Sequence, residues 1–432
     1  MSHRDPATII TKQHCGQIIK NYNKCHKKDF KMLSYAVASA EEAKGFLGEY
    51  FRLAIMCWEP TQSENEELPH EEALQADENF NHEITEENAL KTDDATLLKF
   101  FIKKLPLVHE EHEKVVIFRK EGRLYSTLLA ELLEYSPHLW CPKVYLSSSH
   151  LLVLEDLDEL GYHSLTNKET LKVEEMLPIL KGLAAMHASS ILYELYDKSI
   201  EDNYAECLKE ITVHPDIPWF QVGLKALLEV AKIHPRYQAE ESQKFIEQEL
   251  PYHLRSLYFM VNPSPKYRNV VCHRDSWGGN IFINSEDSEA SAIFVDFQTC
   301  RYCPPIIDVI FTLFLNLSKE ERVAKEKSYL EYYWQQLQFY TKSDKESDVC
   351  LGLNETDFWE SYEEFKLIGY VYRALAKSIL EVPTEMVDEN YKNVDRTEPL
   401  LSYLEDNEEF QEIMFECVED IVEAVVEMSL MS

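Results

Sequence analysis

Four polar residues stand close together in the sequence, between short apolar runs. The segment VVCHRDSWGGNIFIN carries His273, Asp275 and Asn280 in a turn between two strands, and SAIFVDFQ places Asp296 at the end of the next strand. Phosphate transfer from ATP needs such a set. One carboxylate must orient the attacking hydroxyl and accept its proton, and an amide oxygen and a second carboxylate must hold the magnesium ion that neutralises the phosphates. The Asp-x-x-x-x-Asn spacing lets the aspartate face the substrate while the asparagine reaches the metal.

Each of these signals is weak alone, because an HRD triplet or a DF pair often occurs by chance. Their order, their spacing and the strand–turn–strand context are specific when taken together. We therefore expect a catalytic hairpin over residues 267–298.

A basic and an acidic residue upstream supply two further parts of such a site. FIKKLP offers Lys103 or Lys104 on a strand, where an amine can hold the inner phosphates. Alternation along LLKFFIKKL puts the two lysines on opposite faces, and Lys103 is our choice. The helix that follows offers Glu121 as its partner. A solvated helix carboxylate is the alternative interpretation of Glu121, which its position between the strand lysine and the downstream motifs disfavours.

Two backbone segments are candidates for nucleotide binding. Gly45 and Gly48 in GFLGEYFRL could form a turn over the phosphates, although an ordinary hairpin turn fits two glycines equally well. The segment LVLEDL, which contains Glu155 and Leu157, has the apolar-then-acidic pattern of a connection between lobes, and its backbone could hydrogen-bond an adenine edge. The end of a plain strand is an equally good interpretation of this segment.

The apolar spacing divides the chain into a strand-rich first part and a mainly helical second part. Residues 45–57, 96–105, CPKVYL and LLVLEDL have the composition of strands, and residues 110–133 have helical spacing. After Gly161 helices predominate, over 171–195, 218–234, 238–260 and 319–341 and again from about Asp357. We expect an α+β fold of two lobes, with a nucleotide-binding lobe over 1–157, a connection near 155–161 and a helical lobe over 158–432.

The segment 59–94 within the first lobe holds thirteen acidic residues against one lysine. So polar a stretch cannot build a core, and we expect an acidic loop. An acidic arm with a function of its own is the alternative.

The composition of the whole chain limits its partners. A net charge of −34 disfavours binding to nucleic acid or to anionic membrane surfaces. No run approaches the roughly 18 to 20 apolar residues of a membrane span. The N-terminus lacks the apolar block of a secretory signal, and the lysines from Lys20 to Lys31 are interpreted as the polar face of a first helix. Ten scattered cysteines, with one Cys300-x-x-Cys303 pair, form no disulfide framework or zinc pattern, so we expect a reducing, cytoplasmic location. We also expect a monomer.

Several segments together resemble the ecdysteroid kinase-like family, which belongs with choline and aminoglycoside kinases in the protein-kinase-like fold. They are FxKxLP (101–106), RKEGRLYS, CPKVY, LVLEDL, LAAMHASS, CHRDSWGGNIF and VDFQ with IIDVIFTL. The combination of HxDxWxxN with DFQ is specific to this family, and the resemblance runs from about residue 45 to 320. It implies an ATP- and Mg²⁺-dependent kinase whose substrate is a small hydroxylated molecule, either an ecdysteroid-like sterol or a hydroxylated foreign compound.

The resemblance also implies roles for individual residues. Asp275 would be the base, Asn280 and Asp296 the metal ligands, and Lys103 with Glu121 the phosphate-holding ion pair. Asp308 in IIDVIFTL would brace the catalytic turn from the following helix, and His187 in LAAMHASS would be a core buttress.

The chain departs from the family pattern at two places. Arg274 stands where the family usually has glycine, so the triplet HRD is closer to that of protein kinases. Its positive side chain either tunes the base or pairs with a nearby acid. The acidic segment 59–94 is longer than the usual link between the two strands that it joins.

A protein kinase and a non-catalytic binding protein are the two alternatives to a small-molecule kinase. A protein kinase would have lysine where Trp277 stands and glycine where Gln298 stands, and its Ala-Pro-Glu anchor is not found in the sequence. A non-catalytic binding protein of the same fold would typically have lost Asp275, Asn280 or Asp296, and all three are present.

Overall fold

The computed structural model describes residues 9–40, 48–60, 95–105, 113–165, 171–196, 199–287, 289–342 and 352–431. Gly45 and, apart from its first two residues, the predicted acidic loop 59–94 lie outside the described residues. The chain divides into two compact units, of which the first comprises residues 1–130 and 142–161 and the second residues 131–141 and 162–432. Within the ranges given above, no helix combines the length and the apolar character needed to cross a membrane.

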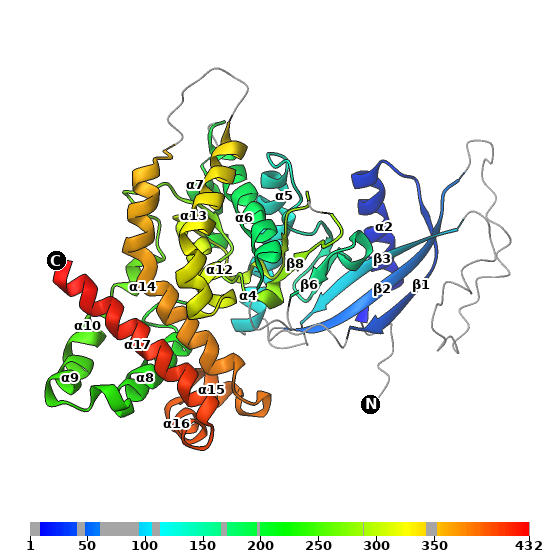
Figure 1. The fold of residues 1–432 in the computed structure, drawn as a ribbon. Helices are drawn as coiled ribbons and strands as arrows, with labels where there is room; N and C mark the ends of the chain where they lie inside the picture. The colour runs from blue at the N-terminus through cyan, green and yellow to red at the C-terminus, as the bar shows by residue number, and fades with distance from the viewer. Residues whose placement is uncertain are drawn as a thin grey trace. The chain divides into compact units, whose positions relative to one another are not determined.

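A five-stranded antiparallel sheet is the framework of the first unit, with the strand order β1-β2-β3-β5-β4. Its strands β1, β2 and β3 are labelled in Figure 1. Its elements are α2 (Lys12–His26), β1 (Lys31–Ser39), β2 (Glu49–Trp58), β3 (Ala95–Lys104), α4 (Glu113–Ser126), β4 (Val144–Ser147), β5 (Leu151–Glu155) and the 3₁₀ turn η2 (Asp158–Leu160). The short helix α5 (Leu128–Leu133) follows α4, so the helix predicted over 110–133 is interrupted at Thr127.

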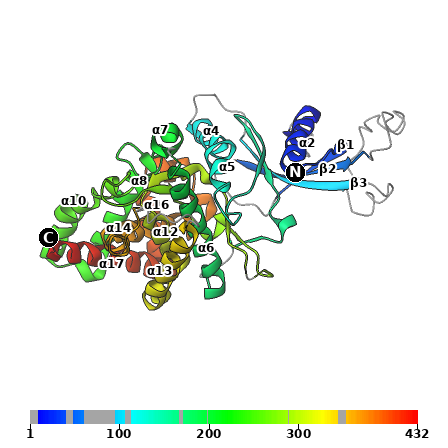
Figure 2. The same cartoon turned by 90° about the horizontal axis from the view of Figure 1, so that it is seen from above.

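The alternation of residues along β3 determines what each face of this sheet presents. Leu98, Phe100 and Ile102 are buried in one apolar cluster with Ile18 and Ile19 of α2. Figure 2 shows α2 lying along the sheet. Because side chains alternate along a strand, the odd-numbered residues of β3, Lys103 among them, belong to the other face.

The first helix is shorter than predicted. It ends at His26, where Lys27 adopts a left-handed backbone conformation with φ of 55°. The side chain of Asn23 then bonds both the N–H and the C=O of Phe30, at 3.0 and 2.9 Å, which fixes the exit of the chain. Lys31 therefore begins β1 and does not lie on the polar face of the helix, as the sequence had suggested.

The second unit is mainly helical, and two small sheets accompany its helices. Helix α6 packs against α13, α12 against α14, and α14 against α17 (Figure 1). Its helices are α6 (Val173–Glu194), α7 (Ile200–Tyr204), α8 (Pro218–Ile233), α9 (Glu240–Lys244), α10 (Leu250–Leu254), α11 (Leu257–Met260), α12 (Ile306–Asn316), α13 (Lys319–Thr341), α14 (Glu355–Leu380), α15 (Glu389–Asn393), α16 (Thr397–Asp406) and α17 (Glu408–Met431). Its shorter turns are η3 (Ala205–Leu208), η4 (Pro235–Tyr237), η5 (Phe245–Glu249), η6 (Gly278–Asn280), η7 (Phe297–Thr299) and η8 (Thr384–Met386).

Among the described residues this unit has five strands, and their pairing shows that one prediction is wrong. They are β6 (His163–Ser164), β7 (Val270–Cys272), β8 (Ile281–Ile283), β9 (Ile293–Phe294) and β10 (Arg301–Cys303). β7 pairs with β10, whereas β8 pairs with β6 and β9. The two strands that flank the turn in segment 267–298, β7 and β8, therefore belong to different sheets. The segment is not the single hairpin that the sequence had suggested.

Two further differences from the predicted elements have local causes. The helix predicted over 238–260 is divided into α9, a π-helical turn, α10 and α11, and Pro251 lies at the break, where its ring and missing N–H interrupt a regular helix. Residues 131–141 belong to the second unit because the Trp140 carbonyl accepts the N–H of Phe294 at 2.8 Å and the Leu139 carbonyl accepts the Ser291 hydroxyl at 3.2 Å.

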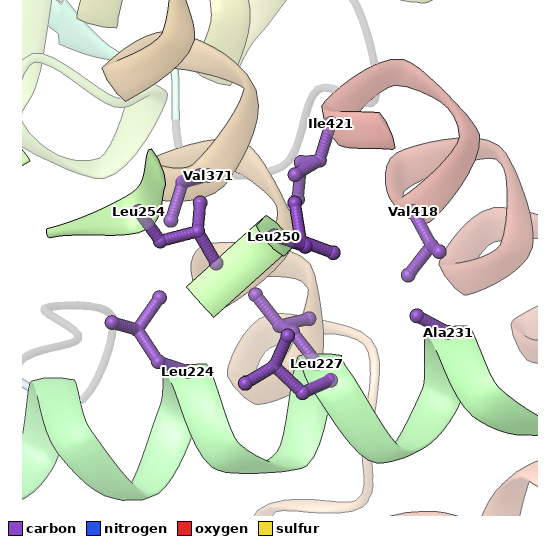
Figure 3. Close-up of a pocket in the computed structure, with 9 residues that line it drawn as sticks. Leu224, Leu227, Ala231, Leu250, Leu254, Val371, Val418 and Ile421 are labelled. Carbon is purple, nitrogen blue, oxygen red and sulfur yellow. The ribbon is translucent and has the colours of Figure 1, made fainter. Parts of the chain in front are cut away.

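The packing of α8 and α10 with α14 and α17 leaves one small apolar hollow (Figure 3). Its lining is aliphatic, with Leu224 and Leu227 of α8 facing Val371 and Ile421. The volume of about 10 Å³ is near the lower limit for a single water, so this hollow is a packing defect and has no place in the chemistry.

Candidate active site

Lys103 and Glu121 form a buried ion pair in the first unit. The Nζ atom of Lys103 lies 2.8 Å from Oε2 of Glu121, and the two side chains are 5% and 1% exposed. Glu121 is placed by α4, which approaches β4 so closely that a Cβ on Gly122 would lie 2.6 Å from the Ser147 hydroxyl. Lys104 belongs to the opposite face and donates to the Ile9 carbonyl at 3.3 Å. The structure thus pairs Glu121 with the lysine that alternation favoured.

Gly48 lies beside the same two lysines at the start of β2. A Cβ at this position would lie 2.8 Å from the Lys104 carbonyl oxygen and 3.7 Å from Cγ of Lys103. Since real Cβ atoms do not approach backbone so closely, only glycine fits between the strands here. Gly45, the other glycine of the predicted turn, lies outside the described residues.

The segment that contains Glu155 and Leu157 is anchored to the sheet by ion pairs. Arg52 of β2 binds Asp156 at 3.0 Å and Asp158 at 2.5 Å. The backbone N–H of Glu155 donates to the Lys143 carbonyl at 2.9 Å, and the Leu157 carbonyl accepts the N–H of Leu160 at 3.1 Å. These two backbone groups are already hydrogen-bonded within the protein. An adenine bound at this segment would therefore have to bond other backbone N–H and C=O groups of residues 155–157.

Asp275, Asn280 and Asp296 come together in the second unit. The amide nitrogen of Asn280 donates to both the backbone carbonyl and Oδ2 of Asp275, each at 2.9 Å. The backbone carbonyl of Asn280 accepts the N–H of Val295 at 3.0 Å, which places the next residue, Asp296, beside this turn. Asp296 has a left-handed backbone with φ of 65°. Because its nitrogen is directed at Asp275, the Asn280 side chain has its oxygen left to bind a cation.

His273 orients Asp275 through its neutral ring. Burial lowers the pKa of His273, whose side chain is fully enclosed. Nδ1 accepts the backbone N–H of Asp275 at 3.2 Å, and Nε2 lies 2.8 Å from the Val295 carbonyl. These partners require a proton on Nε2 and none on Nδ1. The ring therefore links the Asp275 turn to the strand that leads to Asp296.

Asp308, near the start of α12, binds the backbone of the same turn. Its Oδ2 accepts the backbone N–H of His273 at 2.6 Å, and its Oδ1 accepts the N–H of Arg274 at 2.7 Å. His187 of α6 lies 3.1 Å from Oδ2 through Nε2, and its Nδ1 lies 2.7 Å from the hydroxyl of Tyr333. All these side chains are fully buried. They form a continuous line of contacts from α13 through α6 and α12 to the turn.

Asn316 and Thr312, also on α12, complete this support. The Asn316 amide donates to the Ser276 carbonyl at 2.7 Å, and the hydroxyls of Ser276 and Thr312 are 2.7 Å apart. His187, Cys272 and Asp308 are the one group of metal-ligating type found among the described residues. The Asp308 oxygens are already engaged with the turn, so this group is structural.

The sequence model of the ecdysteroid kinase-like family matches residues 80–345, which is more than half of the chain. The chain belongs to the ecdysteroid kinase-like family. The resemblance noted in the motifs is thereby confirmed. The predicted fold class is confirmed as well: the chain has a two-lobed α+β, protein-kinase-like fold, with a strand-rich first unit and a larger helical second unit.

The chain is similar to several known proteins, three of which are described here. An uncharacterized kinase-like protein of Caenorhabditis elegans is 38% identical over 65 residues, a match that spans 15% of this chain and only 17% of that relative. The solved ethanolamine kinase of Plasmodium vivax is 13% identical, with a TM-score of 0.41 and coverage of 92% of this chain and 88% of that one. The solved choline kinase of Streptococcus pneumoniae is 12% identical, with a TM-score of 0.36 and coverage of 91% and 100%.

Several residues of the site were not predicted. Tyr333, Asn316 and Thr312 support the Asp275 turn from α13 and α12. Tyr333 and Asn316 lie in no motif, and Thr312 was given no role although it lies in IIDVIFTL. Glu210 binds Arg274, which answers in part the question that the HRD triplet raised: the arginine does pair with a nearby acid. One signal in the sequence pointed to an unusual backbone at Arg274, because the family usually has glycine at this position. Arg274 indeed has φ of 67°, a conformation in which glycine is favoured.

Proposed function

We propose that this member of the ecdysteroid kinase-like family transfers the terminal phosphate of ATP to a hydroxyl of a small molecule, with Mg²⁺ bound. The observation that carries the proposal is the Asp275–Asn280–Asp296 arrangement. A carboxylate is fixed by the nitrogen of an amide whose oxygen, together with a second carboxylate, supplies the hard oxygen ligands that Mg²⁺ prefers.

Each residue has a separate task in this reaction. Asp275 accepts the proton of the attacking hydroxyl and orients its oxygen toward the phosphate. Asn280 and Asp296 would hold Mg²⁺, which neutralises charge on the phosphates when bound. In the first unit, Lys103 would hold the inner phosphates, with Glu121 keeping its ammonium in place. Little covalent chemistry is asked of the protein, so positioning of these groups accounts for most of its contribution.

We propose two backbone segments for nucleotide binding. The backbone between Glu155 and Leu157 would bind the adenine edge, since Arg52 and its two aspartates hold this segment in a fixed conformation. Gly48, and with it Gly45, would let the backbone approach the phosphates. The position of Gly48 beside Lys103, whose Cγ would lie 3.7 Å from a Cβ at this residue, supports the proposal.

We propose an ecdysteroid-like sterol or a hydroxylated foreign compound as the acceptor. The family to which the chain belongs supports the first, and the hydroxyl-bearing acceptors named in ethanolamine and choline kinases support an alcohol group in general. We place the protein in the cytoplasm. All nine described cysteines are free and eight of them are buried, which suits a reducing compartment.

Replacement of Lys103 tests the nucleotide half of the proposal. In the presence of Mg²⁺, the wild-type protein should release labelled phosphate from γ-labelled ATP with water as the acceptor, and EDTA should stop the release. Lys103→Met should lower kcat/KM for ATP by about 10²-fold, because one charged donor to the phosphates is lost. Lys104→Met is the matched control on the opposite face of β3, and it should stay within about twofold of the wild type. A loss in Lys104→Met with Lys103→Met unchanged would reject this assignment.

A further inference from the structure

Arg274 has a backbone conformation that its residue type disfavours. Its φ of 67° lies in the left-handed region, where a Cβ crowds the following carbonyl and glycine is the usual residue. Asp308 holds the N–H groups of both His273 and Arg274, so the surrounding structure enforces this conformation. Asp275, the proposed base, is the next residue. The backbone conformation of Arg274 therefore helps to determine the direction in which the Asp275 side chain points.

The Arg274 side chain is fully buried and has its own partners. Its Nη1 atom is paired with Oε2 of Glu210, and Nη2 lies 3.4 Å from the hydroxyl of Thr212. The guanidinium carbon lies 5.7 Å from the centre of the Phe311 ring on α12. The side chain is thus held on one side by a carboxylate and on another by an aromatic ring of the helix that carries Asp308.

Glu210 is also held by contacts that do not involve the arginine. Its Oε1 accepts the N–H groups of Thr212 and Val213 at 2.7 and 2.8 Å and the Thr212 hydroxyl at 2.8 Å. Burial alone would raise the pKa of this carboxyl, but the charge of Arg274 and these backbone N–H groups lower the pKa to about 2. Glu210 therefore carries its full negative charge at neutral pH.

We propose that Arg274 and Glu210 form a positioning pair that holds Asp275 in its catalytic direction. The pair ties the catalytic turn to the segment Glu210–Val213, and it maintains, by a buried charge contact, a backbone conformation that glycine would adopt unaided. Kinases whose activation loops are ordered by phosphorylation use pairs of arginine with a phosphorylated residue. In this chain the arginine is paired with the carboxylate of Glu210 instead. The inference rests on the proposed function, because it concerns the direction of the proposed base.

Glu210→Gln is the variant that tests the pair most cleanly. It keeps the size of the side chain and an acceptor oxygen for Thr212 and Val213, but it removes the charge that holds Arg274. With water as the acceptor for γ-labelled ATP, we expect kcat to fall by about 10- to 10²-fold, as for a displacement of about 1 Å, and KM for ATP to stay within about twofold.

A second substitution separates positioning from simple stability. Adding Arg274→Gly to Glu210→Gln should restore much of the lost kcat, because glycine adopts the positive φ without an anchor. If Glu210 acts only through stability, the double variant should be no faster than Glu210→Gln. That result would overturn the proposal.

The chain offers a matched control in the same unit. Arg322 is also buried, pairs with Asp420 at 3.1 Å, and has its guanidinium 4.3 Å from the Phe314 ring of α12. Asp420→Asn should lower the melting temperature but leave kcat unchanged. Hydrogen exchange gives a readout that does not depend on activity: peptides covering residues 270–283 should exchange faster in Glu210→Gln and not in Asp420→Asn.

The outcomes distinguish the two proposals. A wild-type protein that releases no phosphate from Mg·ATP would count against the proposed function, while the exchange measurement would still test the pair. An active wild type with unchanged kcat and unchanged exchange in Glu210→Gln would reject the positioning pair alone.

Discussion

Asp275→Asn should lower phosphate transfer by about 10²- to 10⁴-fold and leave the affinity for Mg·ATP nearly unchanged. The substitution keeps the shape of the side chain and an oxygen that can still accept the Asn280 amide hydrogen, which the aspartate accepts at 2.9 Å. What it removes is the group that takes the proton from the attacking hydroxyl. Nucleotide affinity is measured by calorimetry and transfer by the release of labelled phosphate.

Asp296 and Asn280 supply the contrast for this experiment. Asp296→Asn removes a charge from the proposed metal site, so Mg²⁺-dependent ATP binding should itself weaken. Asn280→Ala should lie between the two and be partly relieved by excess Mg²⁺ or Mn²⁺. Equal losses of ATP binding in Asp275→Asn and Asp296→Asn would contradict the separation of roles. Phosphate transfer at the wild-type rate in Asp275→Asn would show that Asp275 is not the base.

Asp308→Ala should have the largest effect on stability, a loss of roughly 3 to 9 kcal/mol in the free energy of unfolding. It leaves the buried N–H groups of His273 and Arg274 and the ring of His187 without their acceptor, and each such group costs about 1 to 3 kcal/mol. Since domains are typically stable by about 5 to 15 kcal/mol, this is a large share. Urea unfolding gives the measurement.

Two milder variants keep this prediction testable if Asp308→Ala does not fold. Asp308→Asn retains one acceptor oxygen and should show a smaller loss. Tyr333→Phe removes only the 2.7 Å contact with His187 and should cost about 1 kcal/mol. An Asp308→Ala protein that unfolds within about 1 kcal/mol of the wild type would show that the line from Tyr333 to the turn carries little of the stability.

Local patterns predicted the parts of the site that depend on local order. The period of two along β3 identified the lysine that meets Glu121, because one face of this strand is occupied by the apolar cluster with α2. The sequence predicted that Asp275 and Asn280 share one turn, and the structure shows that their side chains are hydrogen-bonded there. Both features involve residues that are close together in the sequence, five positions apart for Asp275 and Asn280 and 18 for Lys103 and Glu121.

Contacts between distant segments could not be predicted in this way. Glu210 meets Arg274 from 64 residues away, and Tyr333 meets His187 from 146 residues away. Arg274 and His187 lie in recognisable motifs, but no motif surrounds Glu210 or Tyr333. The pairing of β7 with β10, instead of with β8, depends on the path taken by the intervening chain. Pro251 is different, because it was a visible signal for a break in the helix predicted over 238–260.

The most direct measurement of the central claim is transfer of label from γ-labelled ATP to a panel of hydroxylated sterols, phenols and amino alcohols. Wild type and Asp275→Asn should be compared side by side, each with Mg²⁺ and with EDTA. The account predicts a labelled phosphate ester of at least one small molecule, formed by the wild type only with Mg²⁺ and reduced by about 10²-fold or more in Asp275→Asn. Wild type that binds Mg·ATP but labels no compound on the panel, or that labels proteins instead, would contradict it.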